Sequence, residues 1–189
     1  MVVKEVPEAF NLVWMDLEMT GLDPKEDTIL EIATIITDKE LNIIAQGPEL
    51  AIHHEKKVLS AMGGWCTKHH GDSGLSRRVL ESNVSMQQAA NETLAFMKEY
   101  AVEGKSPLCG NSIHQDRRFL RRYMPDVDAF LHYRNIDVST LKELQRRWYP
   151  ELRLPKKKVA HLALSDIKDS IAELKIYREK FFLNKADVK

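Results

Sequence analysis

The feature that most constrains this chain is a pair of acidic residues at the end of an early apolar run. Residues 12–15 are apolar and include no turn residue, which is typical of a buried strand covered on both faces. Asp16 and Glu18 follow, and on an extended backbone side chains two positions apart point to the same face. Two like charges at this spacing repel each other unless a cation lies between them, and hard oxygen ligands favour Mg²⁺ or Mn²⁺. Two exposed acids at a strand end explain the pair equally well, so the rest of the chain has to decide.

The composition is that of one globular domain. The 189 residues suffice for a single core, and 43% of them are apolar and 30% charged. Lys plus Arg and Asp plus Glu both number 28, so the net charge offers no long-range attraction to nucleic acid, which would have to bind a local basic patch. We expect a single domain over residues 1–189, with its core at about 11–182 and a flexible C-terminal tail at 183–189.

The compartment is inferred from cysteine usage and from apolar runs. The two cysteines, Cys66 and Cys109, show no metal-type spacing, which indicates reduced thiols in a reducing compartment. No apolar run approaches the roughly 18 residues that a membrane span needs. The first ten residues do not resemble a signal peptide. We therefore expect no membrane partner and a cytoplasmic protein, or a mitochondrial one if a presequence has been removed.

Strand-like and helix-like segments alternate, which predicts an α/β fold. After the first strand, further strands are expected at residues 29–37, 43–52 with a break at Gly47-Pro48, 107–110 and 136–138. Helices are expected at residues 86–100, 117–124, 140–148 with Ser139 as the cap, and about 160–182. Residues 58–74 predict an irregular loop, in which Trp65 and the pair His69-His70 either bind a nucleotide or are ordinary core and solvated residues. Glu31 interrupts the second strand, either as a satisfied acid near the site or as a solvent-facing residue.

Two more acids complete a candidate metal site. Asp116 lies where a strand passes into a helix, at the sheet edge where ligands bind in open α/β folds, although a helix cap also explains it. Asp166 lies near the start of the last helix, five residues after His161. Four carboxylates can hold two cations that clamp the attacking and leaving oxygens of a phosphodiester, and a neutral imidazole can take the proton of the attacking water. The pattern therefore predicts a two-metal nuclease.

Three runs of this chain resemble one known family almost letter for letter. They are residues 16–23 (DLEMTGLD), 110–120 (GNSIHQDRRFL) and 137–144 (DVSTLKEL), and together with His161 and Asp166 they resemble the oligoribonucleases of the DEDDh 3′-to-5′ exonuclease group. The resemblance covers about residues 11–182. It implies an RNase H-like fold, which is a mixed five-stranded sheet flanked by helices. It also implies hydrolysis of short RNA, especially dinucleotides, to nucleoside monophosphates with two Mg²⁺ or Mn²⁺ ions per site.

The resemblance further implies a role for individual residues. The metals would be held by Asp16, Glu18, Asp116 and Asp166, with His161 as the general base. Within one subunit, Leu22 would wedge beside the bases, Trp65 would stack on one of them, His70 would meet the 5′ phosphate of the substrate, and Ser112 would contact the substrate near its 3′ end. A homodimer would place Tyr133 of one subunit over the site of the other, with the 5′ phosphate near Arg134, Ser139 and Thr140. One departure from the family pattern is Ser165, where a second aspartate usually precedes the metal ligand.

Two other functions stay open at this point. The chain could be a broader DEDDh exonuclease that trims longer RNA or DNA, or a non-catalytic nucleic-acid-binding protein on the same fold. A pure binder gains nothing from a cluster of acids beside phosphate, because like charges repel. The intact acids and His161 therefore favour an enzyme.

Overall fold

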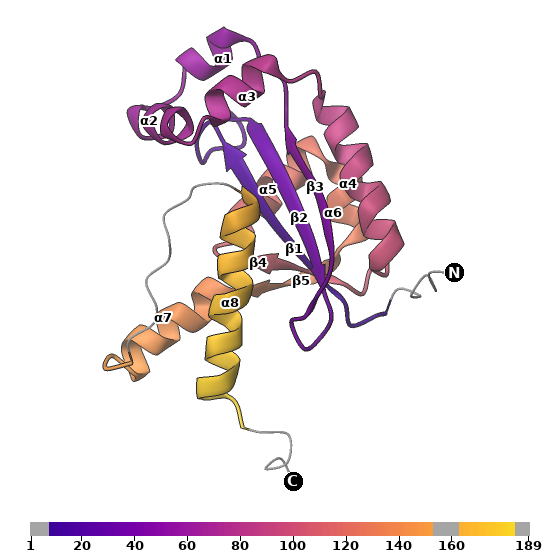
Figure 1. Ribbon diagram of the computed structural model, residues 1–189, viewed down its shortest axis with the longest axis vertical. Helices are drawn as coiled ribbons and strands as arrows, with labels where there is room; N and C mark the ends of the chain where they lie inside the picture. Colours follow the sequence, from indigo (N-terminus) through magenta and orange to yellow (C-terminus); the bar gives the residue numbers. More distant parts are fainter. Residues whose placement is uncertain (1–7, 153–162, 184–189) are drawn as a thin grey trace.

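The computed structural model describes residues 8–152 and 163–183, and a five-stranded sheet lies at its centre (Figure 1). The strand order is β3-β2-β1-β4-β5. β1 (Leu12–Met19) pairs antiparallel with β2 (Ile29–Thr37), which pairs antiparallel with β3 (Ile43–Ala51). β4 (Pro107–Gly110) runs parallel to β1, and β5 (His132–Asp137) runs parallel to β4. A mixed five-stranded sheet flanked by helices confirms the predicted fold class.

Helices cover both faces of the sheet, which explains why residues 12–15 of β1 are all apolar. Val13, Met15 and Leu17 point to one core, which is closed by α4 (Met86–Tyr100), α5 (His114–Tyr123) and α6 (Pro125–Phe130). Trp14 points to the opposite core, which is closed by α7 (Val138–Trp148) and α8 (Ala163–Phe181). Successive residues of β1 thus alternate between two buried faces. None of the helices within 8–152 and 163–183 is long and apolar enough to cross a membrane.

Three short helices gather at the end of the sheet where β1 finishes. These are α1 (Lys56–Ser60), α2 (Gly64–Asp72) and α3 (Leu75–Glu81), and Figure 1 shows them together beyond the tip of β1 and the start of β2. Leu59 and α3 residues Leu75 and Val79 pack around Leu30 at the start of β2. The prediction of an irregular loop over residues 58–74 was wrong. α2 buries a single side chain, His70, so it lacks the apolar stripe by which a helix is recognised.

Several predicted boundaries also differ from the structure. Gly47-Pro48 does not break β3; instead, the β2–β3 register shifts between Ala33 and Ile35. β5 begins at His132 instead of residue 136. The sequence did not indicate the first half of this edge strand, because most of its residues there are exposed and show no apolar alternation. α7 is capped by the carboxylate of Asp137, which accepts a hydrogen bond from the Ser139 nitrogen, so Ser139 is not the cap. Residues 160–162 of the predicted last helix and 184–189 of the predicted tail lie outside the described residues.

Candidate active site

Three of the four predicted metal ligands meet at one end of the sheet. Asp16 and Glu18 lie near the end of β1, and Asp166 lies in the first turn of α8, which packs across β1 and β2. One carboxylate oxygen from each of the three lies within 4.8 Å of the other two. The sheet and the helix thus bring together acids that are 150 residues apart in sequence, as a shared cation requires.

Asp116, which lies on α5, is hydrogen-bonded to β1 next to these three acids. Its side chain lies in the first turn of that helix, is 6% exposed, and accepts a hydrogen bond from the Leu17 nitrogen at 2.9 Å. Leu17 is the residue between Asp16 and Glu18, so this bond fixes the fourth carboxylate beside the other three. Asp116 therefore does not act as a helix cap.

Burial and mutual repulsion raise the pKa values of these acids. Burial, followed by the charges of Asp116 and Glu18, raises the pKa of Asp16 well above its usual range. Burial and then the charge of Asp166 raise the pKa of Glu18 to about 8, and burial raises that of Asp116 to about 7. A divalent cation among these oxygens would reverse the shifts, because it favours the charged carboxylates. The donors are hard oxygens, which fits Mg²⁺ or Mn²⁺.

A partly buried ion pair next to Glu18 was not recognised in the sequence. Glu31 is opposite Glu18 in the β1–β2 register, is fully buried, and accepts a hydrogen bond from Arg78 of α3. The charge of Glu31 raises the pKa of Glu18, and that of Arg78 lowers it. Of the two interpretations of Glu31, the structure excludes the solvent-facing residue and supports an acid near the site, paired with Arg78 through one of its two carboxylate oxygens. The available signal was one acid within an otherwise apolar strand, but its partner is 47 residues away.

Three predicted substrate residues lie on the elements next to the acids. Leu22 follows the end of β1 and is 63% exposed, and Trp65 on α2 is 64% exposed and stacks on the His69 ring at 3.9 Å. His70, in contrast, is buried. Its Nε2 lies 2.9 Å from the carbonyl oxygen of Met19, and its Nδ1 lies 3.9 Å from a carboxylate oxygen of Glu18. α2 thus contributes one exposed aromatic ring and one imidazole that faces Glu18 of the acidic group.

A second group of predicted substrate residues lies between β4 and α7. The Ser112 nitrogen donates to Asp137 and to the Ser139 hydroxyl, both at 2.9 Å, and the two serine hydroxyls are 3.1 Å apart. Thr140 is exposed in the first turn of α7. Tyr133 and Arg134 are exposed on β5, with the Arg134 guanidinium 4.9 Å from the Tyr133 ring. The predicted general base, His161, lies outside the described residues.

Comparison with known proteins defines the class. The family model described as RNase_T, exonuclease, matches residues 13–174. Exonuclease I of E. coli superposes with a TM-score of 0.70 at 16% identity, and that of Methylocaldum szegediense with 0.68 at 20% identity. Both matches cover 90% of this chain but only 41% of the longer exonuclease chain, and at these identities they show the fold alone. Fold and family match together define an exonuclease domain.

Relatives of similar sequence narrow the assignment from exonucleases in general to one family. An oligoribonuclease from Colwellia psychrerythraea is 62% identical over 173 residues, which are 91% of this chain and 96% of the relative. One from Hydrogenovibrio crunogenus is 60% identical over 174 residues, which are 92% and 95% of the two chains. The chain belongs to the oligoribonuclease family of RNase T-type exonucleases.

Proposed function

We propose that this oligoribonuclease, a 3′-to-5′ exoribonuclease of short RNA, prefers dinucleotides and cleaves them by two-metal-ion catalysis. The observation that carries the proposal is the convergence of acids from β1 and α8 within 4.8 Å, with Asp116 tied to Leu17 beside them. A site of this kind suits hydrolysis of a phosphodiester, whose attacking and leaving oxygens both need charge stabilisation.

The metal chemistry follows from the four carboxylates. Asp16, Glu18, Asp116 and Asp166 would hold two Mg²⁺ or Mn²⁺ ions, which would supply Lewis-acid stabilisation of the phosphoryl oxygens. The hydrogen bond from Leu17 orients Asp116, and the β1 backbone keeps Asp16 and Glu18 on one face. His161 would take the proton from the attacking water.

The substrate residues would hold the bases and phosphates around this centre. Leu22 and Trp65 offer exposed apolar surfaces for the bases, in keeping with stacking as the usual way to hold single-stranded RNA. His70, which faces Glu18, would meet the 5′ phosphate of the substrate. Because the Ser112 and Ser139 hydroxyls are 3.1 Å apart, Ser112 would share the 5′ phosphate with Ser139, instead of binding near the 3′ end.

The proposed preference for short RNA has a physical reason that can be tested. A 5′ phosphate enclosed by Ser139, Thr140 and Arg134 leaves no path for a longer chain to continue. We expect initial rates on end-labelled RNA with magnesium to be highest for two-mers and to fall steeply up to ten-mers. Equal rates across the series would favour the broader exonuclease, and binding without cleavage, measured by calorimetry, would favour a non-catalytic binder.

Tyr133 gives a second test, because a homodimer would place its ring over the site of the other subunit. The side chain is 69% exposed in a single chain. We expect Tyr133→Ala to lower kcat/KM on a dinucleotide by about 10-fold, since stacking of one base on an aromatic ring contributes ~1–3 kcal/mol. Sedimentation velocity should show that the variant remains a dimer. A dilute monomer with full activity would reject the contribution of Tyr133 across subunits.

A further inference from the structure

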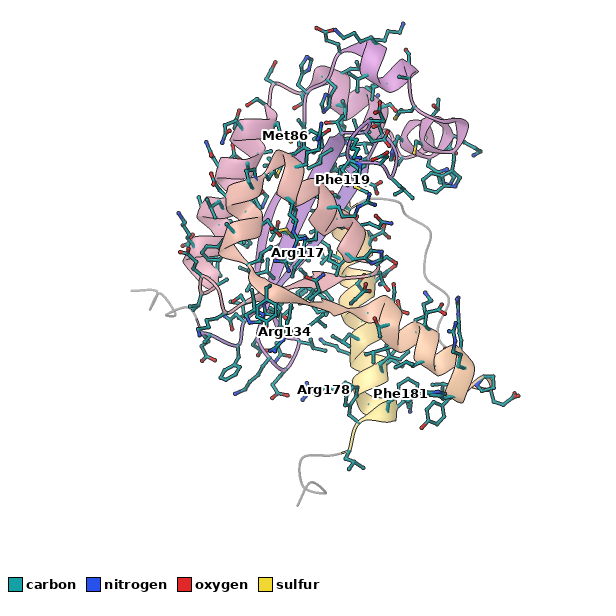
Figure 2. All side chains as sticks on the ribbon, turned by 180° about the vertical axis from the view of Figure 1, so that it is seen from behind. Met86, Arg117, Phe119, Arg134, Arg178 and Phe181 are labelled. Atoms are coloured by element: carbon teal, nitrogen blue, oxygen red, sulfur yellow. The ribbon has the colours of Figure 1, made fainter. Side chains whose placement is uncertain are left out.

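Arg117 follows Asp116 directly, yet its side chain serves a different element. It is 5% exposed and lies between α5 and β5 (Figure 2). Its Nε donates to the Asp128 carboxylate at 2.8 Å. Its Nη1 donates to the carbonyl oxygens of His132 and Tyr133, at 2.9 and 3.1 Å, and to the Asn135 side chain at 2.6 Å. One buried guanidinium thus binds three of the first four residues of β5.

β5 needs these bonds because its pairing with β4 is interrupted. Pro107 of β4 pairs with His132, but Leu108, the next residue, pairs with Asn135. Tyr133 and Arg134 are therefore extra residues in a bulge, and a bulge removes main-chain groups from the sheet ladder. A main-chain carbonyl without a partner is costly when buried. The Arg117 guanidinium replaces the lost ladder bonds at the two carbonyls where the bulge begins.

The bulge turns two side chains outward. The Tyr133 ring packs against its own chain neighbours, with the His132 ring centroid at 4.5 Å and the Arg134 guanidinium at 4.9 Å. The Arg134 nitrogen also donates to His132 Nδ1 at 3.1 Å. Since these contacts are all with neighbouring residues of β5, the direction of the Tyr133 ring follows the β5 backbone, and Arg117 holds that backbone.

We propose that Arg117 is a positioning residue that holds the β5 bulge so that Tyr133 and Arg134 reach the substrate bound to a second copy of the chain. The inference rests on the proposed dimeric site. Asp116 and Arg117 are adjacent in the first turn of α5. Asp116 would bind metal in the site of its own subunit, and Arg117 would position Tyr133 and Arg134 for the site of the other subunit. Nothing in this role requires Arg117 to touch the substrate.

The first test replaces Arg117 by lysine, which keeps a positive charge but has a single donor nitrogen, whereas the planar guanidinium binds Asp128 through Nε and the two β5 carbonyls through Nη1. We expect kcat/KM on a dinucleotide to fall by roughly 10-fold, as for a small displacement of a substrate-holding group, and the rate ratio of two-mers to ten-mers to fall with it. Mn²⁺ binding measured by calorimetry should stay unchanged, because Asp116 is intact. Arg121→Lys is the matched control, since Arg121 pairs with the same Asp128 at 3.3 Å and should retain wild-type kinetics.

A milder variant keeps the proposal testable if Arg117→Lys does not fold. Asn135→Ala removes one acceptor of the guanidinium from an exposed position and leaves the buried arginine in place. It should lower the two-mer to ten-mer ratio in the same direction by a smaller factor. An unchanged ratio in every variant that folds would overturn the proposal.

Mixed dimers separate support of the neighbouring site from an effect within one subunit. Arg117→Lys subunits retain the acids, and Asp166→Asn subunits retain the bulge. A mixed dimer therefore combines one intact metal site with a correctly held Tyr133 from its neighbour, and dinucleotide turnover should recover above that of either variant alone. No recovery would overturn the proposal. If Tyr133→Ala is itself without effect, the proposed dimeric site fails; if only Arg117→Lys and Asn135→Ala are without effect, the present inference fails alone.

Discussion

Asp166→Asn and Asp116→Asn are each expected to lower dinucleotide turnover by at least ~10³-fold, because each variant would remove one of the four charged carboxylates proposed to hold the metal ions that stabilise the phosphoryl transition state. Asparagine keeps the shape of both side chains, and at position 116 it keeps an acceptor for the Leu17 nitrogen. Without metal the acids raise one another's pKa values, so removing one charge should leave the thermal stability of the metal-free protein unchanged or higher.

Steady-state kinetics with magnesium, together with thermal unfolding, measure both effects. Asp126→Asn is the matched control, because Asp126 is an exposed acid in the first turn of α6. It should retain wild-type turnover. Full activity of the variant at Asp116 or Asp166 would contradict the assignment of that residue as a metal ligand.

The second large effect is on the stability of the folded protein, which should depend on pH and on bound metal together. The pKa of Glu18 is about 8 and that of Asp116 about 7 in the folded chain, against ordinary values of 4.5 and 3.8. Between these limits the folded state binds more protons than the unfolded state, so the metal-free protein loses stability as the pH rises. A divalent cation binds the deprotonated oxygens, and its stabilising effect should therefore grow over the same range.

Melting temperatures with magnesium and with chelator test this prediction. The gain from magnesium should be several degrees larger at about pH 8.5 than at about pH 5.5, since each kcal/mol moves the melting temperature of a chain of this size by about 2–4 °C. Glu18→Gln should reduce the difference between the two pH values, because it removes one of the groups that must lose a proton. An equal gain at both pH values would show that the cation binds elsewhere.

The sequence predicted the parts of the fold that depend on local patterns. Residues 12–15 showed a strand buried on both faces, and the two-residue period placed Asp16 and Glu18 on one side of it. Asp116 was ambiguous from local rules, because a residue between a strand and a helix can be a cap or a ligand. The family resemblance favoured the ligand, and the bond from Leu17 is consistent with that role.

The features that were missed depend on tertiary structure. The sequence of α2 is not amphipathic, and its one buried residue, His70, contacts the carbonyl oxygen of Met19 at the end of β1. The partner of Glu31 lies on α3, and no periodicity links the two. The bulge at Tyr133 and Arg134 is a matter of register between β4 and β5, which a single strand sequence does not encode.

The most direct test of the account is a crystal structure with Mn²⁺ and a nucleoside monophosphate, in which anomalous scattering locates the ions. We predict two anomalous peaks about 3.5–4 Å apart, as in other two-metal sites, ligated by oxygens of Asp16, Glu18, Asp116 and Asp166, with the phosphate bound between them. Manganese bound away from these four side chains, or a phosphate that occupies another part of the chain, would contradict it.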